Sequence, residues 1–171
     1  MTKTRSKYTE YSGIQLFALT FLRVLIGWHF LYEGMVKLFS PGGWTAEFFL
    51  ANSVGPLSPL FKLLANNETS LFLVDQLNIW GLTIIGLGLF LGFYTRILKL
   101  MGMVLLFLYY AAYPPFAIFD VAVPLEGSYW IVNKNLVELA ALFVLYLFPS
   151  SHLTGIDRYR RIRNEKQRIE P

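Results

Sequence analysis

The stretch RVLIGWHFLYEGMVKLF, residues 23–39, decides the fold class of this chain. It is almost continuously apolar, and with the residues before it, it is long enough for a membrane-spanning helix, which needs about 20 residues. Yet it contains four ionisable side chains, Arg23, His29, Glu33 and Lys37. Ionisable groups inside a membrane are costly and usually either pair or serve a function. The interpretation of the chain therefore depends on where these four side chains point.

Apolar segments of roughly spanning length recur along the chain. Of its 171 residues, 55% are hydrophobic, and the mean hydropathy of +0.48 is high for a soluble domain. The segments are residues 14–39, 77–95, 100–119 and 131–148. A transmembrane barrel would need at least eight alternating segments. We therefore predict an all-α integral membrane protein, a four-helix bundle. The first segment is not expected to be a cleaved signal, because it is long and charged in its core.

Most basic residues fall on one side of such a bundle. They are Lys3, Arg5 and Lys7 before the first helix, Arg96 and Lys99 between the second and third, and Arg158, Arg160, Arg161, Arg163, Lys166 and Arg168 near the C-terminus. The positive-inside rule then places both termini in the cytoplasm. The predicted parts are a cytoplasmic leader at 1–13, the four-helix domain at 14–150 and a basic cytoplasmic tail at 151–171. Such a tail is typical of contact with anionic lipid rather than nucleic acid.

The two connections on the outer, periplasmic side are expected to be ordered. Residues 40–76 and 114–135 are rich in large apolar side chains but interrupted by Pro and Gly. Neither is expected to span the membrane. They either pack along the outer interface, or form a lid or a docking surface for a partner.

Helical spacing of 100° per residue puts the four ionisable groups on one half of the first helix. The other half carries Leu25, Trp28, Tyr32, Met35 and Leu38. By its rise of 1.5 Å per residue, Arg23 lies near the midplane, and His29, Glu33 and Lys37 follow toward the outer surface. Polar and aromatic residues of the other helices reach that same outer depth: Asn78, Trp80, Tyr109, Tyr110, Tyr113, Lys134, Asn135 and Glu138. We predict a polar pocket that opens outward; the alternative is a buried salt-bridge network that fixes helix register.

Glycines indicate where helices approach closely. Gly81, Gly88 and Gly92 recur on one face of the second helix, and Gly27 and Gly34 offer small surfaces on the first. Small residues allow close helix contact in membranes. The stripe therefore predicts packing.

The candidate site residues follow from chemistry. The proton-carrying, catalytic candidates are His29, Glu33 and Glu138. The candidates for binding a cofactor are Arg23, Lys37, Trp80, Tyr109, Tyr113, Lys134 and Asn135. The chain has no cysteine, which excludes disulfides, thiol chemistry and Cys-ligated metals. No metal is expected, because the second imidazole, His152, is predicted on the cytoplasmic side. No flavin, haem or nicotinamide motif is present either.

Three motifs resemble the DoxX family. The first helix reads R-x3-G-x6-G-x2-K from Arg23 to Lys37, the second reads G-x-G-L-F-L-G-F-Y-T-R from Gly86 to Arg96, and the fourth carries N-x2-E-L-A from Asn135. The resemblance covers about residues 14–150. The family includes the DoxD-like membrane subunit of thiosulfate:quinone oxidoreductase. Resemblance to it implies a multi-pass protein of a prokaryotic inner membrane, often within an oxidoreductase complex, with a quinone (menaquinone or ubiquinone) as electron acceptor.

The leading hypothesis is a quinone-linked membrane subunit of an oxidoreductase, in which aromatic walls hold the ring, and Arg23 or Lys37 stabilises its reduced, anionic form. An anionic reductant such as thiosulfate would be attracted by the same cations. The second hypothesis is a non-enzymatic scaffold or assembly factor that docks a periplasmic or membrane partner. The third is a pathway for a small solute or protons, which would call for a homo-oligomer. Fold alone does not choose among them.

Overall fold

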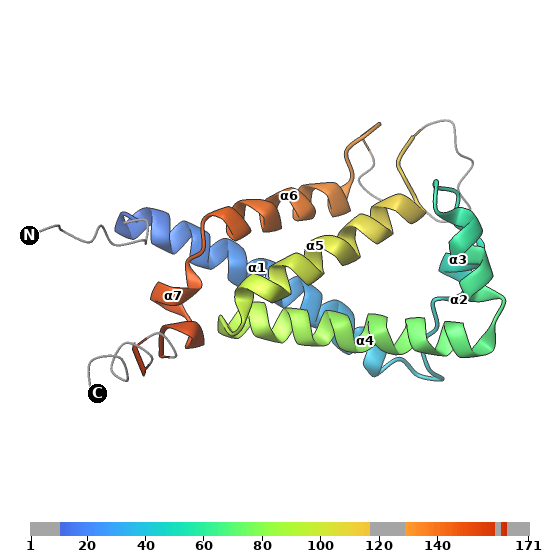
Figure 1. Ribbon diagram of the computed structural model, residues 1–171, viewed down its shortest axis with the longest axis horizontal. Coiled ribbons are helices and arrows are strands. Elements are labelled where there is room, and N and C mark those ends of the chain that lie inside the picture. The colour runs from blue at the N-terminus through green and yellow to red at the C-terminus, as the bar shows by residue number, and fades with distance from the viewer. Residues whose placement is uncertain (1–10, 117–128, 160–161, 164–171) are drawn as a thin grey trace, which may run out of the picture.

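The computed structural model describes residues 11–116, 129–159 and 162–163, and in these ranges the regular structure is helical (Figure 1). The helices are α1 (Gly13–Leu38), α2 (Glu47–Ala51), α3 (Ser58–Ala65), α4 (Glu68–Leu91), α5 (Thr95–Ala112), α6 (Lys134–Leu147) and α7 (Ser151–Thr154). The four longest run lengthwise, α2 and α3 lie at one end, and α7 lies at the other (Figure 1). The predicted all-α class is confirmed for the described residues.

Three of these helices are long and apolar enough to cross a membrane. They are α1 with 26 residues, α4 with 24 and α5 with 18. The fourth long helix, α6, has 14 residues, or about 21 Å at 1.5 Å per residue, against a hydrocarbon core of about 30 Å. The described residues therefore contain three candidate spans instead of the four predicted, and these apolar helices indicate a membrane protein.

Helix α4 begins earlier than its hydropathy predicts. The expected segment was 77–95, but the helix starts at Glu68, where the Asn67 side chain accepts a hydrogen bond from the Ser70 backbone N–H at 3.0 Å. This cap satisfies one of the free donors of the first turn. The added turns carry polar residues such as Asp75, so an apolar window alone assigned them to the outer connection.

The turn from α4 to α5 is short, as expected, but it comes earlier in the chain. Gly92, in the left-handed region at φ 74°, ends α4, and α5 starts three residues later at Thr95. The Asp157 carboxylate accepts hydrogen bonds from the backbone N–H groups of Tyr94 at 3.0 Å and Thr95 at 3.3 Å. The N-terminus of α5 is therefore capped by a residue that is distant in sequence, and a local sequence pattern could not predict this cap.

Two basic residues assigned to this turn lie inside α5 instead. Arg96 and Lys99 belong to its first two turns, and Lys99 is only 1% exposed. The sequence expectation was wrong here because it placed the start of this helix near residue 100.

Close packing of α1 against α4 depends on three glycines. A Cβ added to Gly27, Gly34 or Gly86 would collide with backbone atoms of the facing helix. Gly81 has open space instead, and Gly88 faces α5. The predicted glycine stripe on α4 is therefore not the surface that contacts α1; Gly86 is.

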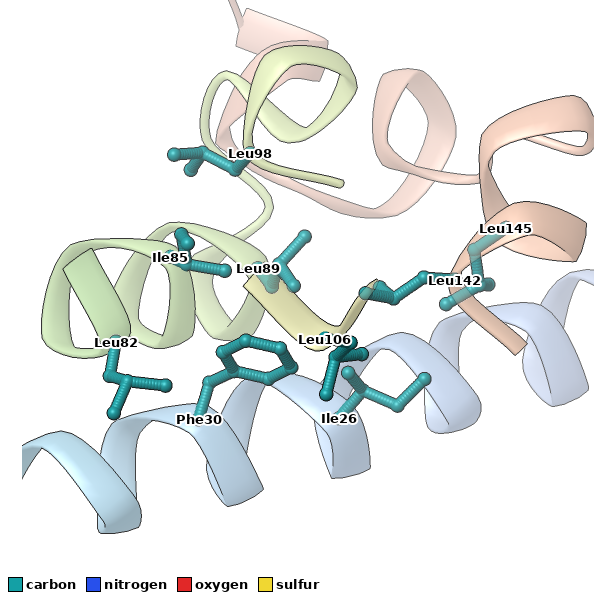
Figure 2. Close-up of a cluster of buried hydrophobic side chains, with 9 residues drawn as sticks. All are labelled: Ile26, Phe30, Leu82, Ile85, Leu89, Leu98, Leu106, Leu142 and Leu145. Carbon is teal, nitrogen blue, oxygen red and sulfur yellow. The ribbon is translucent and has the colours of Figure 1, made fainter. Parts of the chain in front are cut away.

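The main core joins all four long helices. Figure 2 shows the buried set: Ile26, Phe30, Leu82, Ile85, Leu89, Leu98, Leu106, Leu142 and Leu145. Ile26 and Phe30 point from α1 toward the interior of the bundle (Figure 2). The five apolar residues that helical spacing placed on the opposite half of α1, among them Trp28 and Tyr32, are exposed at its surface, as predicted.

The α2–α3 end is closed by a second apolar cluster. Its buried members are Ala46, Leu50, Phe61, Ala65, Ala112 and Tyr113. The backbone N–H groups of Val54 and Gly55 donate to the Ala112 carbonyl at 3.1 and 3.0 Å, which satisfies the C-terminus of α5. The connection after α1 thus folds over the bundle. Residues 117–128 of the second outer connection, and the leader at 1–10 and tail at 164–171, lie outside the described residues.

Candidate functional site

A cavity of about 430 Å³ opens at the α2–α3 end, among α1, α2, α4, α5 and α6. Its lining residues are His29, Phe30, Glu33, Lys37, Trp44, Thr45, Ala46, Phe48, Phe49, Asn78, Leu82, Leu106, Tyr109, Lys134, Asn135 and Glu138. Most predicted site residues are among them: His29, Glu33, Lys37, Tyr109, Lys134, Asn135 and Glu138. The structure therefore brings together groups that are up to 109 positions apart in the chain.

The His29–Glu138 pair joins α1 to α6 at one wall of this cavity. The Nδ1 atom of His29 lies 2.8 and 3.0 Å from the two carboxylate oxygens of Glu138. The Glu138 side chain is 12% exposed and that of His29 46%. A sheltered carboxylate held against an imidazole with one open edge is an arrangement suited to accepting and relaying a proton.

The second ion pair lies within α1, one turn further on. Lys37 Nζ donates to Glu33 Oε2 at 2.8 Å and lies 5.2 Å from the ring centroid of Trp44. This cation–π contact links α1 to the segment that leads into α2. The backbone N–H of Ala46 in turn donates to Asp75 of α4 at 2.7 Å. The cavity rim is thus tied to both neighbouring helices.

The first turn of α6 supplies two more lining residues. The Asn133 side chain caps this helix by accepting from the Leu136 N–H at 3.0 Å, which fixes Lys134 and Asn135 at its first two positions. A cation at a helix N-terminus is unfavourable with respect to the helix dipole. Lys134 therefore occupies a position that is unfavourable with respect to the helix dipole. Two carboxylates, those of Glu33 and Glu138, line the same cavity.

A buried polar side chain of the cavity wall comes from α4. Asn78 is 9% exposed, and it lines the cavity together with Tyr109 of α5. Its Oδ1 atom is buried without a hydrogen-bond partner among the described residues. A buried amide oxygen without a partner is costly, so this atom is an acceptor available to a donor in the cavity.

Aromatic walls come largely from a segment that the candidate set omitted. Trp44, Phe48 and Phe49 line the cavity from the connection after α1. The Phe49 ring packs on Tyr113 with centroids 4.7 Å apart and on Tyr109 at 6.0 Å. The signal available in the sequence was the apolar composition of residues 40–76, which was interpreted as a lid or docking surface without naming these side chains as walls.

Three other aromatic candidates do not line the cavity. Tyr113 lies behind the wall, and its hydroxyl donates to the Phe49 carbonyl at 2.8 Å. The Tyr110 hydroxyl donates to the Ile131 carbonyl at 2.9 Å, on the loop before α6. Trp80 is 48% exposed on the outside of α4. Their side chains point away from the cavity, which the predicted depth along each helix did not reveal.

Arg23 is also outside the cavity. It is 2% exposed, and its Nη2 donates to the Thr154 carbonyl at 3.1 Å, at the α7 end of the molecule. Arg23 therefore does not take part in a salt-bridge network with Glu33 or Glu138, which pair with Lys37 and His29 instead. Without it, the lining has two lysines, two glutamates and His29, so the lysine and carboxylate charges balance when His29 is neutral.

A second, apolar groove adjoins the first cavity. It measures about 500 Å³ and runs between α1 and α6, lined by Leu22, Leu25, Ile26, His29, Tyr129, Val132, Asn133, Lys134, Val137, Glu138 and Ala141. His29, Lys134 and Glu138 line both spaces. The hydrogen-bonded pair of His29 and Glu138 thus stands between a polar, aromatic cavity and an apolar groove. Among the described residues no cluster of three His, Asp or Glu side chains is arranged to hold a metal ion.

A comparison with protein families matches the DoxX model over residues 18–114, more than half of the chain. Comparisons with curated proteins and with solved structures returned no match. The matched range runs from α1 to just past the end of α5. It contains the α1, α4 and α5 sides of the cavity, whereas the residues that α6 contributes lie beyond it.

Proposed function

This chain belongs to the DoxX family, and from that premise we propose that it is a quinone-linked membrane subunit of an oxidoreductase complex in a prokaryotic inner membrane. Menaquinone or ubiquinone would bind in the cavity at the α2–α3 end. The residues there fit such a ligand in size and chemistry. Cavities that hold small molecules are typically about 300–1,000 Å³, mostly apolar, with a few convergent polar groups.

The observation that carries this proposal is the position of His29 and Glu138 between two spaces. A quinone has a polar ring and a long apolar chain. The aromatic cavity suits the ring, and the groove between α1 and α6 suits the chain.

The chain's own residues would have distinct roles. Trp44, Phe49 and Tyr109 would hold the ring between aromatic faces. His29 and Glu138 would take up or release the protons that accompany its reduction. Lys37 would stabilise negative charge on the ring oxygens, a role that Arg23 is too distant to share. When bound, the quinone itself supplies the electron-accepting chemistry.

The reductant is a separate question. The sequence alone suggested that the cations of the pocket attract an anion such as thiosulfate. With His29 neutral, the two lysines and two glutamates that line this cavity balance, so they give little electrostatic reason for an anionic reductant to enter it. A partner subunit that delivers electrons at the α2–α3 end remains part of the proposal.

We further propose four membrane crossings, with both termini in the cytoplasm and α2–α3 on the periplasmic side. The Thr20 hydroxyl on α1 lies 2.8 Å from that of Thr154 on α7, so the chain returns after α6 to the end where α1 begins. An even number of crossings accounts for this return. Helix α6 then crosses with the help of its flanking residues, as short spans do by local thinning of the bilayer.

The test is a titration of the purified protein in lipid nanodiscs with menaquinone, monitored by quenching of tryptophan fluorescence. Wild type is expected to show saturable quenching. Glu138→Gln removes the charge that holds His29 and should weaken binding about tenfold, equivalent to about 1.4 kcal/mol. The matched control is Glu68→Gln on α4, which does not line the cavity and should bind as wild type does.

Two results would contradict the proposal. One is an absence of saturable quenching while circular dichroism shows a folded protein. The other is equal weakening in Glu68→Gln, which would mean that any lost carboxylate perturbs the nanodisc signal. Titration with the bare ring lacking its isoprenoid chain separates the two spaces: weaker binding of the bare ring is expected if the groove contributes.

An exposed apolar surface on α2 and α3 supports the alternative function, a non-enzymatic scaffold. Phe48, Leu60 and Leu63 are 63%, 50% and 67% exposed on α2 and α3. An exposed apolar patch beyond the membrane marks an interaction site. A scaffold predicts that photo-crosslinking from Leu63 captures a defined partner while Glu138→Gln has no effect on quinone-dependent activity of the complex.

A further inference from the structure

A third cavity lies at the opposite end of the molecule from the proposed quinone site. It measures about 630 Å³ and is bounded by the start of α5, the end of α6 and the α7 segment. Its lining residues are Tyr94, Thr95, Arg96, Ile97, Lys99, Tyr146, Leu147, Pro149, Ser151 and Asp157. Nothing in the proposed quinone chemistry uses this cavity.

Lys99 is a buried cation in its wall. The residue is 1% exposed, and its Nζ donates to the Leu145 carbonyl at 2.7 Å. An ammonium has three donors, and this one forms no ion pair with a carboxylate among the residues that the structure describes. Since a buried charge is costly unless it is paired, Lys99 calls for an anion.

The surrounding charges do not supply that anion. Arg96 lines the same cavity, and Arg23 is buried nearby with its Nε and Nη1 atoms lacking partners among the described residues. The carboxylate here is Asp157, and both of its oxygens accept hydrogen bonds from the first residues of α5. The carboxylate of Asp157, which already caps α5, is thus set against three cations, those of Lys99, Arg96 and Arg23.

The rim of the cavity combines donors with apolar surface. Arg96 is exposed, and its guanidinium stands 5.7 Å from the ring centroid of Tyr146. On either side, Ile97 and Leu147 are 57% and 54% exposed. Arg recognises phosphate oxygens in a bidentate manner, and exposed aliphatic side chains at a helix end suit acyl chains.

We propose that this cavity binds the phosphate group of an anionic membrane phospholipid. Lys99 and Arg96 hold the phosphate oxygens, and the acyl chains lie along Ile97 and Leu147. Free inorganic phosphate offers the same charge, but it makes no use of the apolar flanks. The site does not depend on the quinone proposal, because it needs only a chain embedded in lipid.

Native mass spectrometry of the detergent-purified protein tests this with phosphatidylglycerol and phosphatidylcholine of matched acyl chains. Phosphatidylglycerol should bind more tightly. Arg96→Gln and Lys99→Met should each weaken that preference about fivefold, the effect of about 1 kcal/mol per lost cation. The matched control is Arg158→Gln, which removes one positive charge at the same end but outside this cavity, and it should retain the preference.

Arg96→Gln keeps the test decisive even if Lys99→Met fails to fold, because Arg96 is exposed. Equal retention of the two lipids by wild type would overturn the proposal. So would equal losses in Arg96→Gln and Arg158→Gln, which would indicate diffuse attraction to surface charge. Inorganic phosphate titrated against the lipid complex should not displace it; displacement would identify free phosphate as the ligand and overturn the lipid assignment.

Discussion

Arg23 shows how a single buried cation can be held without a carboxylate. Its guanidinium donates to the Thr154 carbonyl, and Gly92 and Gly155 approach Nη1 so closely that a Cβ on either would collide with it. Arg23 therefore holds the α7 segment against the start of the bundle, a role distinct from the one its sequence position suggested.

Arg23→Met is expected to release the segment that follows α7. The loss of the Thr154 contact lowers the local free energy of opening, so trypsin should cleave after Arg158 and Arg163 several times faster than in wild type. Limited proteolysis of the detergent-purified protein, followed by mass spectrometry, measures this. Lys37→Met, at the other end of α1, is the control and should not change the cleavage rate; unchanged cleavage in Arg23→Met would contradict the assigned contact.

At the scale of helices, close contact between α1 and α4 rests on the absence of side chains at a few positions. Gly27, Gly34 and Gly86 lie where the two backbones meet. Without a hydrophobic driving force between helices in lipid, such close packing provides much of the association energy. Periodicity identified glycines suited to packing, but the partner surface depends on the rotation of each helix in the assembled bundle.

Gly34→Ala should destabilise the protein by about 1–3 kcal/mol, because the new Cβ meets the backbone and side chain of Thr83 and forces the helices apart. Gly81→Ala is the matched control on α4: its Cβ meets open space, so stability should be unchanged or higher by up to about 1 kcal/mol from helix propensity. Thermal unfolding in detergent, followed by circular dichroism, compares the two. A similar melting temperature for both variants would show that the contact is not tight.

The bounds of a helix were predicted correctly only where they coincide with the ends of an apolar segment. The apolar parts of α1, α4 and α5 were found, but the starts of α4 and α5 were misplaced by nine and five residues. Asn67 and Asp157 cap these two helices, and the second of these caps comes from the far end of the chain. Hydropathy averaged along the sequence does not detect side-chain caps. It also does not detect polar turns that extend a helix beyond its apolar part.

At the scale of the whole molecule, the proposed orientation can be measured directly, because the chain has no cysteine. Leu63→Cys on α3 and Tyr159→Cys after α7 both place a thiol at a well-exposed position. In intact cells, a membrane-impermeant maleimide should label the first and not the second. Labelling of Tyr159→Cys should appear only after permeabilisation.

The wild-type chain is the blank for this experiment. Labelling of both positions from outside would mean that α6 does not cross the membrane, and the four-crossing arrangement would be wrong. Labelling of Tyr159→Cys alone would invert the orientation derived from the basic residues.

Much of the candidate site could be predicted from periodicity and depth. These placed His29, Glu33, Lys37, Lys134 and Glu138 at a common level on inward-facing surfaces, and all five line the cavity. The aromatic wall from Trp44 to Phe49 could not be assigned, because the connection after α1 has no regular period from which a direction follows. Trp80 and Tyr113 were misplaced for the related reason that depth does not fix rotation.

Composition and a period of 3.6 residues were enough to predict the all-helical class, the apolar parts of α1, α4 and α5, and the polar face of α1. The resemblance to the DoxX family rested on three short motifs instead. Which charges meet follows only from the packing of the helices in three dimensions. In the folded protein, His29 pairs with Glu138, Arg23 contacts the α7 segment, and Lys99 is buried beside a cavity. These outcomes depend on the rotation and register of helices against one another, and those are set by close backbone approach and by caps between distant segments, which no local pattern encodes.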